Sequence, residues 1–170
     1  ISSFGDVSLT NVFYDSITKK KKKGILSGYA DGTFKSEKTI IRSELLAIVL
    51  KSLEIEQHGE LLVGIFKDVP PQHWVNPLVS EAVKRKIVTT DRPFFEPNRD
   101  VTRVEFLAIL ALASGEQIPD TPIKKWSDIA SDHWSHKYAE FALRYNLLDN
   151  ISGDKFRPND SISRGEIAEA

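Results

Sequence analysis

The chain has 170 residues, of which 41% are hydrophobic and 28% charged, so its composition is that of a folded protein with a proper core and is far from that of a disordered chain. Its 23 Lys and Arg residues against 24 Asp and Glu give a formal net charge of −1, which predicts no general attraction to nucleic acid or to an anionic membrane. The sequence has no cysteine, which excludes disulfides and cysteine-ligated metal sites, and it has no run of 18 apolar residues that would predict insertion into a membrane.

Three related units follow one another along the chain. Arg42, Arg103 and Arg164 are 61 residues apart, and short stretches recur around them in a constant order: FGDV, FKDV and WSDI, then QHWV and DHWS, then FKSE, FEPN and FRPN. A repeat of this length indicates supersecondary units that bury their apolar faces against one another. We therefore expect three modules, at 1–58, 59–118 and 119–170, that together form one structural domain.

Each unit begins with an expected helix. In the second and third units, apolar residues recur at helical spacing from Trp74 and from Trp134, so we expect these tryptophans in the core more than on a sugar-binding surface. The first helix is expected to end at Gly24, a residue suited to a left-handed helix stop. The lysine run at 19–23 then occupies its last turn, where cations favour the helix dipole, although a basic anion-binding patch is the alternative.

A long loop leads from the first helix of each unit to the second. The loops are rich in turn signals, and one buried phenylalanine is expected to fix each of them to the core: Phe34, Phe95 and Phe156. The second helix begins with a capping box in two units, formed by Thr102 with Glu105 and by Ser163 with Glu166. In the first unit Glu44 remains, but Ile41 has no side-chain acceptor, so this helix start should be less well fixed.

The repeated arginine has no such local explanation, because a positive charge in the first turn of a helix opposes the helix dipole. One hypothesis is a salt bridge to the recurring aspartate of each unit, namely Asp6, Asp68 and Asp128. The other is that the arginine and the free N–H groups at the helix N-terminus together receive an anion, such as a carboxylate on a ligand.

This ordered set of motifs resembles the S-layer homology family over essentially the whole chain. The resemblance implies an all-α fold in which three helix-loop-helix pseudorepeats assemble into one pseudo-threefold helical domain with grooves between neighbouring modules. It implies a noncatalytic anchor at the cell surface, which binds secondary cell wall polysaccharide linked to peptidoglycan, commonly through a pyruvylated sugar. The glycan-binding residues that it implies are Arg42, Arg103, Arg164, Trp74, Trp134 and Gly28.

Several positions depart from the family pattern. Ser43, Val104 and Gly165 stand where alanine is usual, and the first module has Val12 where the other two have tryptophan. We therefore expect the three grooves to differ in binding. Because the chain stops six residues after Arg164, the last helix is expected to be truncated or to continue beyond this segment of a longer precursor.

Two other classes of function stay open at this point. A glycan-acting enzyme would need paired carboxylates across a cleft, but Glu105 and Glu166 are expected to serve as caps. A protein-interaction or lattice scaffold without glycan binding would show an exposed apolar patch and would tolerate loss of the arginines. We expect no cofactor or metal, since His73 and His133 have no second ligand at suitable spacing. The resemblance also implies a secreted protein at the cell surface, for which self-assembly through regions outside this segment stays open.

Overall fold

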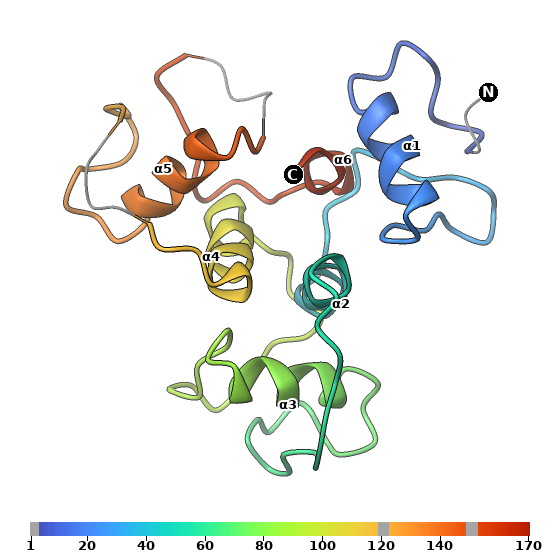
Figure 1. Cartoon of the computed structure of the whole chain (residues 1–170), viewed down its shortest axis with the longest axis vertical. Coiled ribbons are helices and arrows are strands. Elements are labelled where there is room, and N and C mark those ends of the chain that lie inside the picture. The colour runs from blue at the N-terminus through green and yellow to red at the C-terminus, as the bar shows by residue number, and fades with distance from the viewer. Residues whose placement is uncertain (1–3, 119–122, 149–152) are drawn as a thin grey trace.

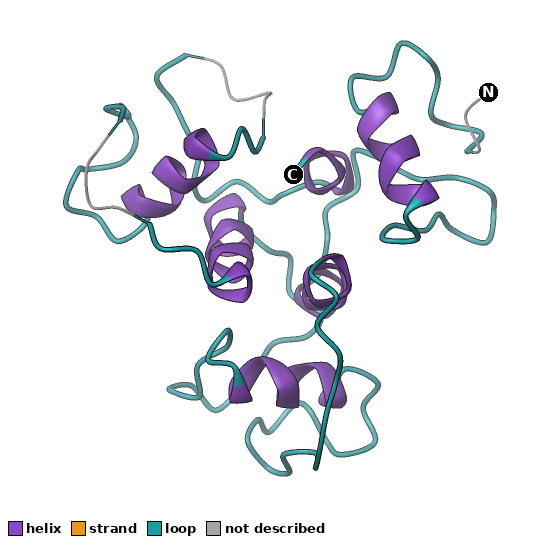
Figure 2. Cartoon of the chain, in the orientation of Figure 1, coloured by secondary structure: helices purple, strands orange, loops and turns teal. Residues whose placement is uncertain are grey.

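The computed structural model describes residues 4–118, 123–148 and 153–170, and within these ranges the chain forms helices and loops but no strand (Figures 1 and 2). The helices are α1 (Tyr14–Lys22), α2 (Arg42–Ser52), α3 (Asn76–Lys84), α4 (Arg103–Ser114), α5 (His136–Arg144) and α6 (Arg164–Glu169). The all-α class predicted from the sequence is confirmed. The module boundary expected at residue 119 lies outside the described residues.

The helices alternate between an inner and an outer position. Figure 1 shows α2, α4 and α6 at the centre and α1, α3 and α5 around them. Each outer helix packs on the central helix of the preceding module: α3 on α2, α5 on α4 and, closing the circle, α1 on α6. The modules therefore interlock, and each outer helix buries its apolar face against a neighbouring module.

A ring of backbone hydrogen bonds joins the segments that lead into the central helices. The N–H of Val101 donates to the carbonyl of Ile40 at 3.1 Å, that of Ile162 to Val101 at 2.9 Å, and that of Ile40 to Ile162 at 3.3 Å. All three side chains are fully buried. The ring holds the N-termini of α2, α4 and α6 in fixed positions around the pseudo-threefold axis.

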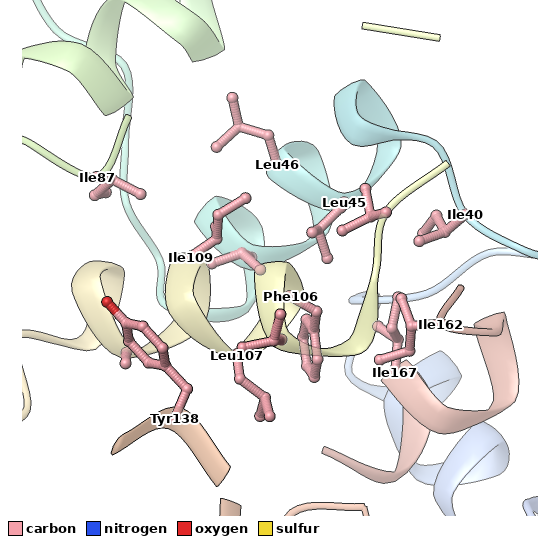
Figure 3. Close-up of a cluster of buried hydrophobic side chains, with 14 of the residues drawn as sticks. Ile40, Leu45, Leu46, Ile87, Phe106, Leu107, Ile109, Tyr138, Ile162 and Ile167 are labelled. Atoms are coloured by element: carbon pink, nitrogen blue, oxygen red, sulfur yellow. The ribbon is translucent and has the colours of Figure 1, made fainter. Parts of the chain in front are cut away.

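The main hydrophobic core surrounds the central helices (Figure 3). Apolar residues of α2 and α4 point into it, and Tyr138 joins them from α5; the residues drawn include Leu45, Leu46, Phe106, Leu107 and Ile109. A smaller cluster packs α1 against its own loop through Phe4, Phe13, Ile17 and Phe34. The three loop phenylalanines are buried as predicted, with 0 to 2% of each exposed.

The recurring aspartates fix the loops. Asp6 accepts hydrogen bonds from the backbone N–H groups of Phe34 and Lys35, both at 2.7 Å. Burial raises the pKa of the Asp6 carboxyl, but these bonds outweigh it and the pKa lies below its ordinary value. Asp68 and Asp128 bind the equivalent N–H pairs of their own modules. The hypothesis of a salt bridge between these aspartates and the repeated arginines is therefore wrong: among the described residues no such pair forms, and the aspartates bind the loop backbone instead.

The ends of the outer helices follow the sequence signals. After α1 ends, Gly24 adopts a left-handed φ of 70°, and four lysines occupy the last turn of the helix, as predicted. Lys86 and Asn146 take the same left-handed conformation at the equivalent positions, with φ of 60° and 51°.

None of the helices in the described part of the chain has the length and apolar character needed to cross a bilayer.

Candidate functional site

The N-termini of the central helices meet the loop of the following module. In α2 the N–H groups of Arg42 and Ser43 donate to the carbonyls of Arg99 and Pro97, at 2.9 and 3.0 Å. The starts of α4 and α6 are held in the same way by Asp160 and Pro158, and by Lys38 and Ser36. The first two N–H groups of each central helix are therefore occupied and are not free to receive an anion, contrary to that hypothesis. The arginine side chains remain as candidates for that part.

Side-chain caps complete two of the three helix starts. Thr102 Oγ1 accepts from the N–H of Glu105 at 3.4 Å, and the Glu105 carboxylate accepts from the N–H of Thr102 at 2.9 Å. Ser163 and Glu166 form the same pair in α6. At α2 Glu44 accepts from the N–H of Ile41 at 3.5 Å, and Ile41 offers no acceptor in return.

The three repeated arginines lie at equivalent interfaces between neighbouring modules, which are called seams below. The Arg42 guanidinium lies 5.0 Å from the centre of the Phe95 ring. Arg103 donates from Nη1 to the carbonyl of Phe156 at 2.8 Å, and Arg164 donates from Nε to the carbonyl of Phe34 at 2.9 Å. Each arginine thus crosses from the start of a central helix to the buried phenylalanine of the next module.

The charge of each arginine is balanced differently. Arg103 forms a buried ion pair with Glu166, and both side chains are less than a tenth exposed. Arg164 is as deeply buried, but its hydrogen bonds go to the neutral carbonyls of Ser27 and Phe34, at 2.7 and 2.9 Å, and no ion pair reaches it among the described residues. The positive charge at Arg103 is neutralised within the protein, whereas that at Arg164 has no carboxylate in contact.

The side chain of Arg42 makes no hydrogen bond to any other described residue, and its Nε is buried without a partner. Burial lowers the pKa of its guanidinium below the usual value, because the charged form has lost part of its hydration. Glu105 is near enough to attract it, but that carboxylate is held by Arg99 through hydrogen bonds of 2.6 and 3.1 Å. Arg42 is therefore a partly dehydrated cation with open hydrogen-bonding positions.

Two of the seams are hollowed. The Arg42 groove has a volume of about 360 Å³ and is lined by Arg42, Phe95, Arg99, Glu105 and Trp134 among others. The Arg164 groove has a volume of about 270 Å³, and its lining includes Ser27, Glu44, Ala47, Lys51, Trp74 and Arg164. Each groove combines an arginine of one module, the loop and central helix of the next, and a tryptophan of the third.

The tryptophans contradict the expectation that they belong to the core. α3 begins at Asn76 and α5 at His136, so Trp74 and Trp134 precede their helices, and 57% and 55% of their surfaces are exposed. The His73 ring stacks on Trp74 with ring centres 6.2 Å apart, and the His133 ring lies tilted beside Trp134 with ring centres 5.7 Å apart. Each indole therefore presents exposed surface at the edge of a groove.

Three segments of the chain, residues 3–46, 65–107 and 127–168, match the family model of the S-layer homology domain, and together they cover most of its length. The chain belongs to the S-layer homology domain family. Each match falls within one of the modules expected from the sequence.

Curated relatives carry related functions in their names. The chain is 30% identical to a cellulosome-anchoring protein of Acetivibrio thermocellus over 83% of its own length and 33% of that protein. It is 23% identical to the S-layer protein sap of Bacillus anthracis, over 98% of this chain and 20% of that one. An amylopullulanase of Thermoanaerobacterium thermosulfurigenes is 26% identical over 98% of this chain but only 9% of that enzyme.

The chain thus spans a third or less of these relatives. Family and relatives together support a location at the cell surface and an anchoring role. S-layer homology domains are anchoring modules, not catalytic ones, and the similarity to enzymes is confined to a small part of each.

Gly28 lies beside the Arg164 groove of this S-layer homology chain. Its neighbours Ser27 and Tyr29 both contact Arg164, through the Ser27 carbonyl and through the Tyr29 ring, whose centre is 4.9 Å away. A Cβ at Gly28 would overlap the ring of Phe4 and lie 2.7 Å from the carbonyl oxygen of Thr33. Glycine therefore allows this loop to pack tightly enough for the Ser27 carbonyl to reach the arginine.

Two groove residues were missed by the sequence reasoning. Arg99 holds Glu105 in the Arg42 groove, and Lys51 lines the Arg164 groove from α2. A signal for Arg99 was present, because Lys38 and Arg99 each stand four residues before the motif arginine, where the third module has Asp160. Lys51 had no such signal, since its equivalent in the second module is Leu112.

Proposed function

We propose that this chain attaches its protein to the cell envelope by binding an acidic secondary cell wall polysaccharide in the Arg42 and Arg164 grooves. A carboxylate of the glycan, such as that of a pyruvylated sugar, pairs with the arginine. The observation that carries the proposal is the state of Arg42: a half-buried guanidinium with open donors, facing a groove of about 360 Å³.

A carboxylate is the ligand that this arrangement favours. Burial has removed water from the Arg42 guanidinium without supplying a protein acceptor, so a carboxylate that forms charge-assisted hydrogen bonds recovers the lost interaction. Such a contact contributes about 1.5 to 3 kcal/mol. Arg164 differs in detail, since two of its nitrogen atoms already donate to carbonyls, but its charge is not balanced by a carboxylate in contact.

The tryptophans supply the apolar side of each groove. A sugar ring has C–H groups on its faces and hydroxyls at its edge, so an exposed aromatic surface beside a polar groove suits it. Trp134 and Trp74 are more than half exposed and each lines one groove. The S-layer proteins and the cellulosome-anchoring protein among the relatives are consistent with attachment to the wall.

The Arg103 seam is proposed to bind weakly or not at all. Its arginine is paired with Glu166, and a ligand carboxylate would have to displace that buried partner. In each of the two open grooves, the tryptophan belongs to the module that supplies neither the arginine nor the loop. At the Arg103 seam that module is the one at 1–58, and its residue at the tryptophan position is Val12. This side chain is 84% exposed and offers no aromatic surface.

The proposal is tested by titrating the chain with a hexose that carries a pyruvate ketal, following tryptophan fluorescence, beside the methyl ester of the same sugar. We expect two binding sites for the acid and none for the ester. Arg42→Ala and Arg164→Ala should each remove one site, and the double variant should remove both.

Equal binding of acid and ester, or retention of both sites in the double variant, would contradict carboxylate recognition by these arginines. If the chain binds neither sugar nor any wall polysaccharide, the interaction-scaffold hypothesis takes precedence. Circular dichroism of each variant shows that a loss of binding is not a loss of fold.

A further inference from the structure

The connection from α2 to α3 contains a stretch of backbone that is held by one face of α3. Asn76, Ser80 and Lys84 stand one helical turn apart and bind this backbone with their side chains. The amide of Asn76 donates to the carbonyl of Leu62 at 3.4 Å, and Ser80 Oγ accepts from the N–H of Leu62 at 3.0 Å. Lys84 Nζ donates to the carbonyl of Glu60 at 2.7 Å. The stretch is therefore fixed along the helix.

Residues 60–63, called the edge segment below, have the geometry of a strand. They run without a turn or bend between Gly59 and Gly64, which take left-handed φ of 83° and 74°. The four helical residues from Ser80 to Lys84 rise about 6 Å, and two extended residues span about 6.6 Å. Because the two spacings match, every second residue of the edge segment meets a side chain of α3.

Leu61 and Val63 form the free side of the edge segment. In an extended chain the backbone N–H and C=O groups of neighbouring residues point to opposite sides, so those of Leu61 and Val63 point away from α3 when those of Leu62 point toward it. None of them has a hydrogen bond to any described residue. The two side chains are 45% and 68% exposed, and Figure 1 shows this connection reaching the rim of the molecule. Unpaired backbone groups beside exposed apolar side chains favour pairing with another strand.

A second copy of the edge segment is a matching partner. Two identical strands that pair antiparallel around a twofold axis offer each other the same donors and acceptors. With the axis at Leu62, Leu61 lies opposite Val63 of the second copy and exchanges hydrogen bonds with it in both directions. The symmetry repeats this pair, so every free N–H and C=O group of Leu61 and Val63 finds a partner.

The side chains and charges also fit this register. Leu61 and Val63 of the two copies lie on the same face, and apolar side chains directly opposite each other stabilise a strand pair. Glu60 falls opposite Gly64 of the second copy, so no carboxylate faces another across the pair. A register shifted by two residues places Val63 opposite Gly59 and loses an apolar contact.

We propose that the edge segment joins two copies of this chain by antiparallel strand pairing. The contact is separate from the Arg42 and Arg164 grooves and does not depend on glycan binding. A strand pair this short buries far less than the roughly 1,200 Å² of a stable complex, so the dimer dissociates with a constant on the order of 1 mM. Copies concentrated on one cell surface form it more readily, because their effective concentration is higher.

Sedimentation equilibrium of the intact chain at rising concentration tests the pairing. We expect a monomer at low concentration and a measurable dimer fraction near about 1 mM. Leu61→Lys with Val63→Lys sets like charges opposite each other and should weaken dimerisation by about tenfold or more. Leu9→Lys with Leu112→Lys adds the same charge at exposed positions outside the edge segment, and it should dimerise like the parent. Circular dichroism checks that both variants are folded.

Cysteine cross-linking tests the register, since the chain has no cysteine of its own. Opposed residues that exchange hydrogen bonds have Cα atoms about 5.5 Å apart, which suits a disulfide. A mixture of Leu61→Cys and Val63→Cys chains should therefore oxidise to a dimer faster than either variant alone. Leu9→Cys, at another exposed position, gives the background rate of random collision.

Each contrary result is distinct. A chain that stays monomeric near about 1 mM, with no cross-link above the Leu9→Cys background, overturns the proposal. A dimer that the lysine pair leaves unchanged has its interface elsewhere, and equal oxidation of the mixture and the single variants rejects the register. A monomer that binds an extended apolar peptide through Leu61 and Val63 rejects a second copy as the occupant. None of these readouts involves the wall, so the proposed function stands or falls separately.

Discussion

Arg42, Arg103 and Arg164 occupy equivalent positions in the sequence but differ in what surrounds the guanidinium. The difference comes from residues far along the chain: Glu166 is 63 residues from Arg103, and Phe34 is 130 residues from Arg164. Spacing alone could predict that an arginine stands at each helix start. It could not predict the partner, because the partner belongs to the next module and depends on how the modules close into a circle.

A difference in stability between arginine variants follows from these surroundings. Arg103→Ala removes the arginine from its buried ion pair with Glu166 and should lower the free energy of unfolding by about 3 to 5 kcal/mol. Arg42→Ala removes no side-chain hydrogen bond within the described part of the protein, so its free energy of unfolding should stay within about 1 kcal/mol of the parent value. Urea unfolding of both variants measures the two values. Equal destabilisation would show that the Arg103 pair is not the buried structural contact described above.

At Gly165, packing against another side chain outweighs the usual preference of a helix for alanine over glycine. Replacing a helical glycine with alanine is usually favourable by about 1 kcal/mol. Here the added Cβ would overlap the ring of Phe13, and overpacking of this kind costs about 1 to 3 kcal/mol. We therefore expect Gly165→Ala to lower the melting temperature.

The glycine prediction is checked by a double-mutant cycle with Phe13→Leu. If the overlap is the cause, the glycine change should be less harmful, or favourable, once the ring is gone. A loss that is the same in both backgrounds would place the cause elsewhere.

At the scale of elements, the capping boxes and helix ends were predictable because each is set by residues within a few positions. The starts of the outer helices were not. Trp74 and Trp134 continue the apolar spacing of α3 and α5, but each lies in a turn before its helix, and an apolar residue in such a turn has the same spacing as one in the first helical turn. Spacing therefore could not show that both indoles are exposed.

The start of α2 can be improved by one substitution. Ile41 has the extended backbone of a capping residue, with φ of −88° and ψ of 159°, and Glu44 stands in the right place, but the side-chain acceptor is absent. Ile41→Thr should raise the free energy of unfolding by about 0.5 to 1 kcal/mol.

The reverse change at α4, Thr102→Ile, should cost a similar amount, since Thr102 caps that helix. Denaturant unfolding at constant m-value compares the two variants with the parent. If Ile41→Thr is neutral or harmful, the apolar packing of Ile41 matters more than the missing cap.

At the scale of the whole molecule, the three helix-loop-helix units and their order were readable from the repeats, and the pseudo-threefold domain was implied by the family resemblance. The structure adds the interlocking of modules, in which each outer helix packs on the central helix of the preceding module, and the ring of backbone hydrogen bonds at Ile40, Val101 and Ile162. These contacts join residues from different modules, so no local pattern specifies them. They also decide which tryptophan reaches which groove.

The carboxylates make the stability of the molecule depend on pH. A hydrogen bond from Arg85 lowers the pKa of Glu81 below its ordinary value of 4.5. At Glu105 burial raises the pKa, but hydrogen bonds from Arg99 and from the N–H of Thr102 outweigh it, so the pKa is again lowered. A carboxyl whose pKa is lower in the folded state stabilises the fold above its ordinary pKa. That contribution is lost as the pH falls through the folded value.

We therefore expect the melting temperature to stay level down to about pH 5 and to fall on further acidification. Glu105→Gln keeps the hydrogen-bonding shape of the cap but removes the titration, so its melting temperature should be lower near neutral pH and less sensitive to acid. Calorimetric melts across this range test the expectation. A stability that rises on acidification would contradict the assigned shifts.

The central claim is that Arg42 and Arg164 hold an acidic wall glycan, and co-sedimentation with bacterial wall sacculi tests it most directly. The purified chain is mixed with sacculi before and after acid extraction of the wall-linked polysaccharide, beside Arg42→Ala with Arg164→Ala. Lys22→Ala with Lys23→Ala serves as a control that removes the same charge from an exposed site. The chain and the lysine control should pellet only with unextracted sacculi, and the arginine variant with neither. Pelleting that survives both extraction and loss of the two arginines would contradict the account.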